Sequence, residues 1–354
     1  MFQEPNYRRQ NLKIKRKIIL KKNRISIVTF FIITMSVLVQ TITGCDRNGK
    51  TRKTSIEKSS EKLNDSVWIG KDYRQIPINT DSGKLILYGY RLIINTAYFL
   101  GPKGTVAHVS NGMNCGNCHL NGGTKPFGNN FGKVYSIYPK FRARNNSIQT
   151  IYDRINDCFV RSLNGKALDS TTREMQAIYA YMKWLGEGVP KGTTPAGTIF
   201  KNVAYLERVA NPVEGKKVFA LICQSCHGKN GQGMMNANGI GYIFPPLWGR
   251  NSYNDGAGIY RISEFADFVE YNMPFGTSWQ HPVLTNAQAW DVAAFVNSQP
   301  RPHRDQSMDW KEITNKPIDF PYGPYSDSFS EKQHKYGPFK PILDDHQKTN
   351  KKSF

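Results

Sequence analysis

Cysteine is scarce in this chain, and none of it is free to build a disulfide framework. Only six cysteines occur among the 354 residues, whereas small secreted domains that depend on disulfides are dense in cysteine. Four of the six form two CxxC pairs, and the other two, Cys45 and Cys158, lie in unrelated surroundings. We therefore exclude a disulfide-stapled scaffold and look for other chemistry at these positions.

Acidic residues are also few. The 27 Asp and Glu side chains oppose 48 Lys and Arg, which gives a formal net charge of +21. Nine of the basic residues and one acidic residue lie in the first 44 positions, so the remainder keeps a net charge of about +13. Such an excess favours an anionic substrate, an acidic protein partner or a lipid surface. No nucleic-acid-binding motif is present, and we expect no nucleic acid as a partner.

Each CxxC pair is followed directly by histidine, at residues 115–119 and 223–227. CxxCH is the attachment signature of a c-type haem, whose vinyl groups bond to the two thiols while the histidine ligates the iron. The alternative is one zinc site built from all four thiolates, but that site would not require a histidine after both pairs. We predict two covalently bound haem c groups. The attachment residues are Cys115, Cys118, Cys223 and Cys226, with His119 and His227 as proximal iron ligands.

The first 45 residues have the pattern of an export signal. Basic residues precede an uncharged, mostly apolar run of 18 residues from Ile25 to Ile42. The run ends in Ile-Thr-Gly-Cys45, which resembles the bacterial lipobox, whose cysteine is lipidated and becomes the mature N-terminus. We predict a lipoprotein signal peptide over 1–44 and a periplasmic protein anchored to the membrane by lipid on Cys45. The alternative is an uncleaved anchor helix, because 18 apolar residues just suffice to span a bilayer.

Composition divides the rest of the chain into two domains with flanking segments. A polar stretch over 45–66 predicts a flexible tether, and the Gly- and Pro-containing segment 189–210 predicts a linker. The predicted fold class is mainly α, with two class I cytochrome c-like haem domains, loop-rich connections and an extended C-terminal tail. The haem domains cover 67–188 and 211–303. The tail, 304–354, is rich in aromatic residues for an irregular segment, so we expect it to lie extended over the second domain.

The second domain follows the sequence plan of a class I cytochrome c. Asn211 and Pro212 predict the start of a helix that leads into the second CxxCH motif, because asparagine caps free amides and proline suits the first turn. Gly215 is small enough for another helix to cross there. The predicted partner is the late helix over 285–298.

The distal iron ligand of the second domain is predicted from a Met-Pro pair on the loop before the late helix. Met273 stands there, and thioether ligation raises the potential of a haem. Met234 and Met235 are competing candidates in a Gly-rich loop. The run 245–249, Pro-Pro-Leu-Trp-Gly, should form one wall of the haem site and orient Nδ1 of His227 through a carbonyl.

The first domain contains no Met-Pro pair of this kind, so its distal ligand has several candidates. Cys158 has no disulfide partner, and thiolate is a known haem ligand. A helix predicted over 147–163 places Arg154 and Ser162 one turn before and after Cys158, where a cation and a hydroxyl would flank the sulfur. An inert, buried cysteine is the alternative. Competing ligand candidates are Met113, His108, Met175 and Met182.

These features resemble the dihaem thiosulfate dehydrogenases and tetrathionate reductases over about residues 67–343. The resemblance is most specific around Cys158. It is carried by Tyr138-Pro139, Phe141, Arg144, Arg154-Ile155, Cys158-Phe159, the runs 161–165, 245–249 and 254–258, Met273-Pro274, and the Tyr-Gly-Pro repeats at 322–324 and 336–338.

The resemblance implies a catalytic first domain and an electron-transferring second domain. Haem 1 would be ligated by His119 and Cys158, and haem 2 by His227 and Met273. The reaction couples two thiosulfates into tetrathionate, or runs in reverse, with a soluble cytochrome or another redox protein as electron partner. The residues implied to act on the substrate are Cys158, Arg144, Arg154 and Ser162.

One position departs from the family pattern. Some members carry a lysine directly before the distal methionine, and that lysine can replace the methionine as ligand. The residue here is Asn272, so we expect no such exchange.

Two other functions are compatible with the sequence. One is a dihaem cytochrome that only transfers electrons, and the other is the haem subunit of a sulfur-oxidising multienzyme complex. In contrast to a thiosulfate dehydrogenase, neither of these proteins would react with thiosulfate as an isolated chain.

Overall fold

The computed structural model describes residues 67–352, which belong to one compact unit of the chain. The predicted signal peptide, Cys45 and the tether lie outside the described residues. Helices dominate, as predicted, and the strands of the described part form two small antiparallel pairs. Within residues 67–352, every helix is too short or too polar to cross a bilayer.

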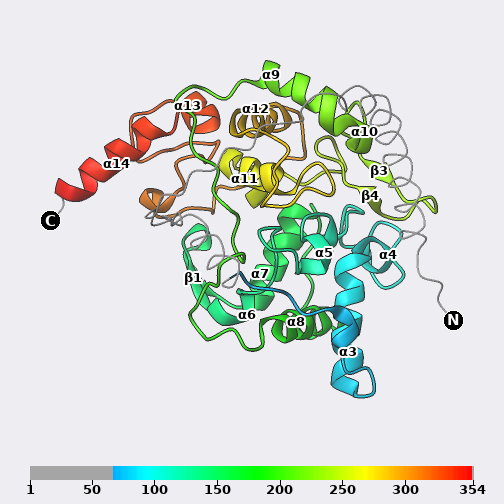
Figure 1. Cartoon of the computed structure of the whole chain (residues 1–354). Coiled ribbons are helices and arrows are strands. Elements are labelled where there is room, and N and C mark those ends of the chain that lie inside the picture. The colour runs from blue at the N-terminus through cyan, green and yellow to red at the C-terminus, as the bar shows by residue number, and fades with distance from the viewer. Residues whose placement is uncertain (1–66, 353–354) are drawn as a thin grey trace, which may run out of the picture. The chain divides into compact units, whose positions relative to one another are not determined.

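The first haem domain is built around two 14-residue helices, α3 and α8, that pack against each other (Figure 1). A Cβ on Gly89 of α3 would lie 2.0 Å from the carbonyl oxygen of Ala177 on α8, so only glycine permits this close approach. The elements are η1 (Tyr73–Gln75), α3 (Asp81–Ile94), α4 (Thr96–Leu100), η2 (Cys115–Asn117), α5 (Leu120–Gly123), α6 (Val134–Ile137), β1 (Lys140–Arg142), η3 (Ala143–Asn145), β2 (Ser147–Gln149), α7 (Ile151–Asp157), the π-helix η4 (Cys158–Ser162) and α8 (Arg173–Gly186).

The helix predicted over 147–163 is shorter than expected and changes type at Cys158. Thr150 and Asp153 form a capping box, in which each side chain accepts a hydrogen bond from the other residue's amide, so the helix starts at residue 151. Ile148 therefore lies on β2 opposite Phe141 and is 73% exposed, instead of joining the apolar face of a helix. From Cys158 to Ser162 the chain forms a π-helix, a geometry that is frequent at functional sites.

The second haem domain confirms the predicted helix start and helix crossing. Asn211 accepts hydrogen bonds from the amides of Val213 and Glu214 at the start of α9. A Cβ on Gly215 would lie 1.8 Å from the carbonyl oxygen of Asp291, so α12 crosses α9 at this glycine (Figure 1). The elements are α9 (Pro212–Val218), the π-helix η5 (Phe219–Cys223), α10 (Gln224–His227), β3 (Met234–Met235), β4 (Tyr242–Phe244), η6 (Gly258–Tyr260), α11 (Ile262–Asn272) and α12 (Asn286–Asn297).

The C-terminal tail, which was expected to be extended, contains helices. It contains η7 (Ile313–Asn315), α13 (Glu331–Tyr336) and α14 (Lys340–Lys352). Helix α13 begins because the side chain of Ser330 caps its first turn. Phe339 is 2% exposed and packs against Trp290 of α12, at 5.5 Å between ring centroids. The aromatic residues of the tail thus supply the buried surface that orders it.

The tail also contacts the first haem domain, which the sequence did not predict. The carboxylate of Asp309 pairs with the guanidinium of Arg161 at 2.8 Å. The amide of Trp310 donates to the carbonyl of Arg144, at 2.9 Å. The tail therefore joins both haem domains.

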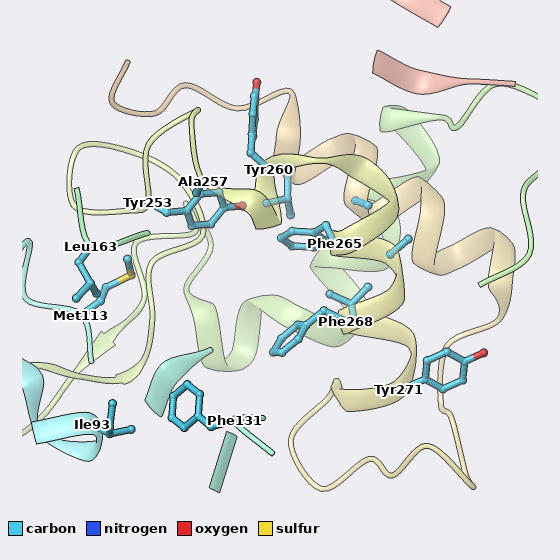
Figure 2. Close-up of a cluster of buried hydrophobic side chains, with 14 of the residues drawn as sticks. Ile93, Met113, Phe131, Leu163, Tyr253, Ala257, Tyr260, Phe265, Phe268 and Tyr271 are labelled. Atoms are coloured by element: carbon cyan, nitrogen blue, oxygen red, sulfur yellow. The ribbon is translucent and has the colours of Figure 1, made fainter. Parts of the chain in front are cut away.

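Buried apolar side chains of the two haem domains form one continuous cluster. Figure 2 labels members from the first domain, among them Met113 and Leu163, together with Tyr253 and Phe268 from the second. Hydrogen bonds add to this contact, since Asn254 donates to the carbonyl of Val160 and to the side chain of Asn164, both at 2.9 Å. The two domains share a core within the described residues.

Candidate haem sites and a cysteine beside the first

The second CxxCH motif presents a buried histidine whose ring is held by the backbone. His227 ends α10, and its Nδ1 lies 2.8 Å from the carbonyl oxygen of Pro245, directly after β4. Burial lowers the pKa of His227. A neutral ring that donates from Nδ1 leaves its Nε2 lone pair free for a metal. The predicted role of the Pro-Pro-Leu-Trp-Gly run in orienting this ring is thus confirmed.

A cavity with an almost entirely apolar lining lies beside His227. A mostly apolar pocket with a few placed polar groups is typical of a cofactor site. Cys223, Cys226 and Met273 all line the same cavity as His227. Two thiols, an imidazole and a thioether around an apolar space are the donor set that a covalently attached haem requires. The residues present therefore fit haem c.

The competing methionines do not share this position. Met234 and Met235 form β3 and are 44% and 48% exposed, and neither belongs to the cavity lining. Met273 follows α11 directly as its C-terminal cap residue. Among the methionines proposed for the second domain, only Met273 faces the cavity.

Asn272 has its amide nitrogen engaged elsewhere. It is 1% exposed and donates to the carbonyls of Phe127 and Phe268, both at 3.0 Å. This arrangement ties the end of α11 to a loop of the first domain. Nothing in it provides a second iron ligand beside Met273.

The first CxxCH motif has the same backbone arrangement around its histidine. Nδ1 of His119 forms a short hydrogen bond with the carbonyl of Asn129, and the ring packs on Phe131 at 4.4 Å between centroids. Burial lowers the pKa of His119 to about 4. The amide of Cys115 donates to the hydroxyl of Thr96, at 3.0 Å, which holds the motif at the start of α4. Both histidines are therefore prepared in the same way to bind iron through Nε2.

The charge of Cys158 reaches this first motif. The charge of a Cys158 thiolate contributes to raising the pKa of Cys115 and of Cys118, although burial is the larger cause for each. Nη1 of Arg154 lies 3.0 Å from the Cys158 sulfur, and Cys158 is the first cause of a raised pKa at Arg154. Arg154 in turn contributes to the lowered pKa of His119, after burial. The thiol and the guanidinium are thus in contact, and their charges act on the haem-attachment residues.

The other candidates for the distal ligand of the first haem lie in positions that favour ligation less. Met113 lines the cavity of the second site. Met175 and Met182 pack in the core on α8, and His108 is exposed on a loop. Among these candidates, Cys158 is the one whose charge acts on both cysteines of the first motif.

Two of the residues implied to act on the substrate are not seen to contact the Cys158 sulfur. Arg144 donates to the carbonyl of Gly256 at 3.2 Å and packs over the ring of Trp310 at 5.5 Å. Burial, followed by the charge of Arg161, lowers its pKa to about 10. Ser162 is half-buried at the end of the π-helix, and no residue in the described range hydrogen-bonds its hydroxyl.

Tyr138, which the sequence marked only as part of the family resemblance, is affected by the charge of Cys158. It is 6% exposed, and its hydroxyl accepts a hydrogen bond from Nη1 of Arg142 at 3.3 Å. Burial raises the pKa of Tyr138, and the charges of Arg154 and Cys158 also act on it. It follows a single helical turn, too short to show a periodic pattern, so only the family resemblance could mark it.

The cavity of the second site also reaches the first CxxCH motif. Asn117 and Cys118 line it beside Cys223 and His227. The side chain of Asn117 donates to the carbonyl of Tyr242, at 3.2 Å, which joins the two motifs through β4. The second haem site therefore borders on the first attachment motif.

A zinc site made of the two CxxC pairs is not formed. In the part of the chain that the structure describes, no group of three or more His, Cys, Asp or Glu side chains is arranged to hold one metal ion. Each pair instead accompanies its own histidine.

Comparison with known families agrees with two haem domains. Residues 105–190 match the SoxA/TsdA cytochrome c domain, and residues 212–300 match the cytochrome c family. The chain therefore carries two cytochrome c domains and two covalently bound haem c groups.

Individual relatives are similar over most of this chain. A thiosulfate dehydrogenase of Stutzerimonas stutzeri is 35% identical over 246 residues, which is 70% of this chain and 76% of the relative. A thiosulfate dehydrogenase of Psychrobacter arcticus is 40% identical over 205 residues, 57% of this chain and 61% of the relative. The solved thiosulfate dehydrogenase TsdBA of Marichromatium purpuratum is 28% identical with a TM-score of 0.62, over 71% of this chain and 52% of that protein. This chain belongs to the thiosulfate dehydrogenase family of dihaem cytochromes.

Proposed function

We propose that this protein couples two thiosulfates into tetrathionate, or performs the reverse reaction, at the first haem. His119 and Cys158 are its iron ligands, and His227 and Met273 are those of the second haem. The observation that carries the proposal is the 3.0 Å contact between Arg154 and the Cys158 sulfur beside the first CxxCH motif. Family membership supplies the substrate, because the relatives are thiosulfate dehydrogenases.

The residues around Cys158 suit a sulfur oxyanion. Thiosulfate is a dianion with a soft terminal sulfur, so it needs a cation for its charge and a sulfur group that can meet its reactive end. Arg154 provides a planar donor fork, of which one nitrogen is engaged with Cys158. The remaining nitrogens are proposed to hold the substrate oxygens. Arg144 and Ser162 remain predicted substrate contacts.

Electrons are proposed to leave through the second site. When bound, the two haems each accept one electron, which matches the two-electron coupling. Cys118 lines the cavity of the second site, so the attachment point of the first haem borders on the second. His119 and His227 hold their rings with Nδ1 on a carbonyl, which keeps Nε2 unprotonated at both sites.

The test is reduction of the haems by thiosulfate in the absence of oxygen, in the parent protein and in Cys158→Ala. We expect the parent to show a reduced α-band and Cys158→Ala to show none. Met182→Leu is the matched control, because it removes a competing sulfur of the same domain with little change in volume. If thiosulfate does not reduce the parent protein, or if it fully reduces Cys158→Ala, the proposal fails. The protein would then be an electron carrier or a subunit of a sulfur-oxidising complex.

Arg154 allows a second test of the same proposal. Loss of one positioned charge donor costs on the order of 100- to 1,000-fold in turnover. We expect that loss in Arg154→Gln and a partial recovery in Arg154→Lys. Arg173→Gln, which removes an exposed charge from α8 of the same domain, should retain parent activity.

We also propose that lipid on Cys45 anchors the protein to a membrane on the periplasmic side, with a soluble redox protein as electron partner. The support is the lipobox-like sequence alone. Cys45→Ala should move the protein from the membrane fraction to the soluble fraction and abolish incorporation of a labelled fatty acid. Retention in the membrane would indicate an uncleaved anchor helix instead.

A further inference from the structure

Four cations of the first domain act on one another by their charges, and two of them contact Tyr138. Lys133 precedes α6, Lys140 and Arg142 lie on β1, and Arg154 lies on α7. We call these four residues the basic cluster. Alternate residues of a strand share one face, so Lys140 and Arg142 lie together.

Contacts to Tyr138 place the two strand cations. Nζ of Lys140 lies 5.8 Å from the centre of the Tyr138 ring, and Nη1 of Arg142 lies 3.3 Å from the Tyr138 hydroxyl. Because Arg142 donates to that hydroxyl, the phenolic hydrogen is left to donate elsewhere. None of the described residues accepts it. Tyr138 therefore presents an unused donor between the cations.

The charges of the basic cluster act on one another without neutralisation. The pKa of Lys133 is lowered first by burial, and the positive charges of Lys140, Arg142 and Arg154 contribute. Within residues 67–352, no member of the basic cluster forms an ion pair with a carboxylate. Such mutual repulsion is relieved when an anion binds.

The two carboxylates whose charges reach the basic cluster are already paired with other arginines. Asp157 acts on Arg154 but lies 3.6 Å from Nε of Arg161. Glu264 acts on Lys133 but lies 3.0 Å from Nη1 of Arg261. Neither carboxylate therefore neutralises the basic cluster, so its positive charge can attract an anion from solution.

We propose that Lys133, Lys140 and Arg142, with the Tyr138 hydroxyl, form a second oxyanion subsite that holds the second thiosulfate next to the one at Arg154. This inference rests on the proposed function. Coupling forms one S–S bond between the terminal sulfurs of two thiosulfates and releases two electrons to the two ferric haems, with no proton taken up or lost. Two dianions must therefore approach each other, and the basic cluster offsets their repulsion.

The experiment counts thiosulfate bound to the fully reduced protein, in which no oxidant remains to turn it over. Calorimetric titration should give two thiosulfates per chain for the parent and one for Lys133→Gln/Arg142→Gln. Lys103→Gln/Lys166→Gln, which removes the same charge from exposed positions of the same domain, should still bind two. In the oxidised protein, the cluster variant should need at least about tenfold more thiosulfate for half-maximal rate, because charge-assisted hydrogen bonds are lost.

Several outcomes would overturn the subsite. They are one thiosulfate on the parent, or two on the cluster variant with the parent's affinity. Lys140→Gln, a single change on the strand, repeats the measurement if the double variant folds poorly. An unchanged electron paramagnetic resonance signal of the first haem would show that the loss is one of binding and not of haem geometry. Failure of the proposed function is seen separately, as full reduction of Cys158→Ala by thiosulfate.

Discussion

Arg161 and Asp309 form a bidentate ion pair across 148 positions of sequence, with Nη1–Oδ2 and Nη2–Oδ1 distances of 2.8 Å. Their side chains are 5% and 9% exposed. Arg161 belongs to the π-helix that starts at Cys158, and Asp309 belongs to the tail. The pair therefore attaches the tail to the π-helix that begins at Cys158.

Asp309→Ala should lower the free energy of unfolding by about 3 kcal/mol, because it leaves a buried guanidinium without its best partner. The loss is limited by Asp157, which lies 3.6 Å from the same arginine. Urea denaturation followed by tryptophan fluorescence would measure it. Glu312→Gln, an exposed carboxylate of the tail, is the control and should change stability by less than about 0.5 kcal/mol. Equal stabilities of the two variants would show that the pair contributes little.

Met273→Leu should lower the midpoint potential of one haem by on the order of 100 mV or more, because it removes the thioether that stabilises ferrous iron. The other haem should keep its potential, since Met273 lines the cavity beside His227. A potentiometric titration followed at the α-band would resolve both. Met234→Leu and Met235→Leu remove exposed thioethers and should leave both potentials unchanged. A shift in either control would reassign the ligand.

Gly215→Ala should destabilise the second domain by about 1–3 kcal/mol, because helices α9 and α12 must separate to admit the methyl group. The new Cβ would lie 1.8 Å from a backbone oxygen, which cannot rotate away. Thermal unfolding followed by circular dichroism would show the loss. Gly258→Ala is the matched control, because its Cβ would meet open space at an ordinary backbone angle. A Gly215→Ala protein as stable as that control would mean that the crossing is not tight.

The buried carboxyl group of Asp267 should make the free energy of unfolding fall as the pH rises. It is 8% exposed, accepts a hydrogen bond from the amide of Val203 at 2.8 Å, and has its pKa raised by burial to about 7. The unfolded chain therefore loses this proton near pH 4 and the folded chain near pH 7, so stability declines between these values and is constant above pH 7.

Asp267→Asn should flatten that decline and be more stable than the parent at pH 8, because the amide oxygen still accepts from Val203 without a buried charge. Urea midpoints at pH 5 and pH 8 would measure the difference. Glu207→Gln removes an exposed carboxylate and should keep the parent's pH dependence. A parallel pH dependence in Asp267→Asn would assign the effect to other groups.

Most of the haem chemistry was predictable because it is encoded locally. Two thiols and a histidine at fixed spacing attach a haem wherever they lie in a fold, and Asn211 caps the helix that follows it in sequence. The prediction was wrong about the length of the Cys158 helix. The capping box of Thr150 and Asp153 was a local signal that the apolar pattern outweighed.

By itself, the sequence determined the two haem-attachment motifs, the methionine of the second site and the unpaired cysteine, because each depends on residue type and short spacing. Tertiary structure alone decided which distant groups meet. It brought Cys118 to the cavity of the second site, turned Arg144 toward Gly256, and closed Arg161 on Asp309. Those contacts depend on how helices and loops pack over more than a hundred residues, and no local pattern records that packing.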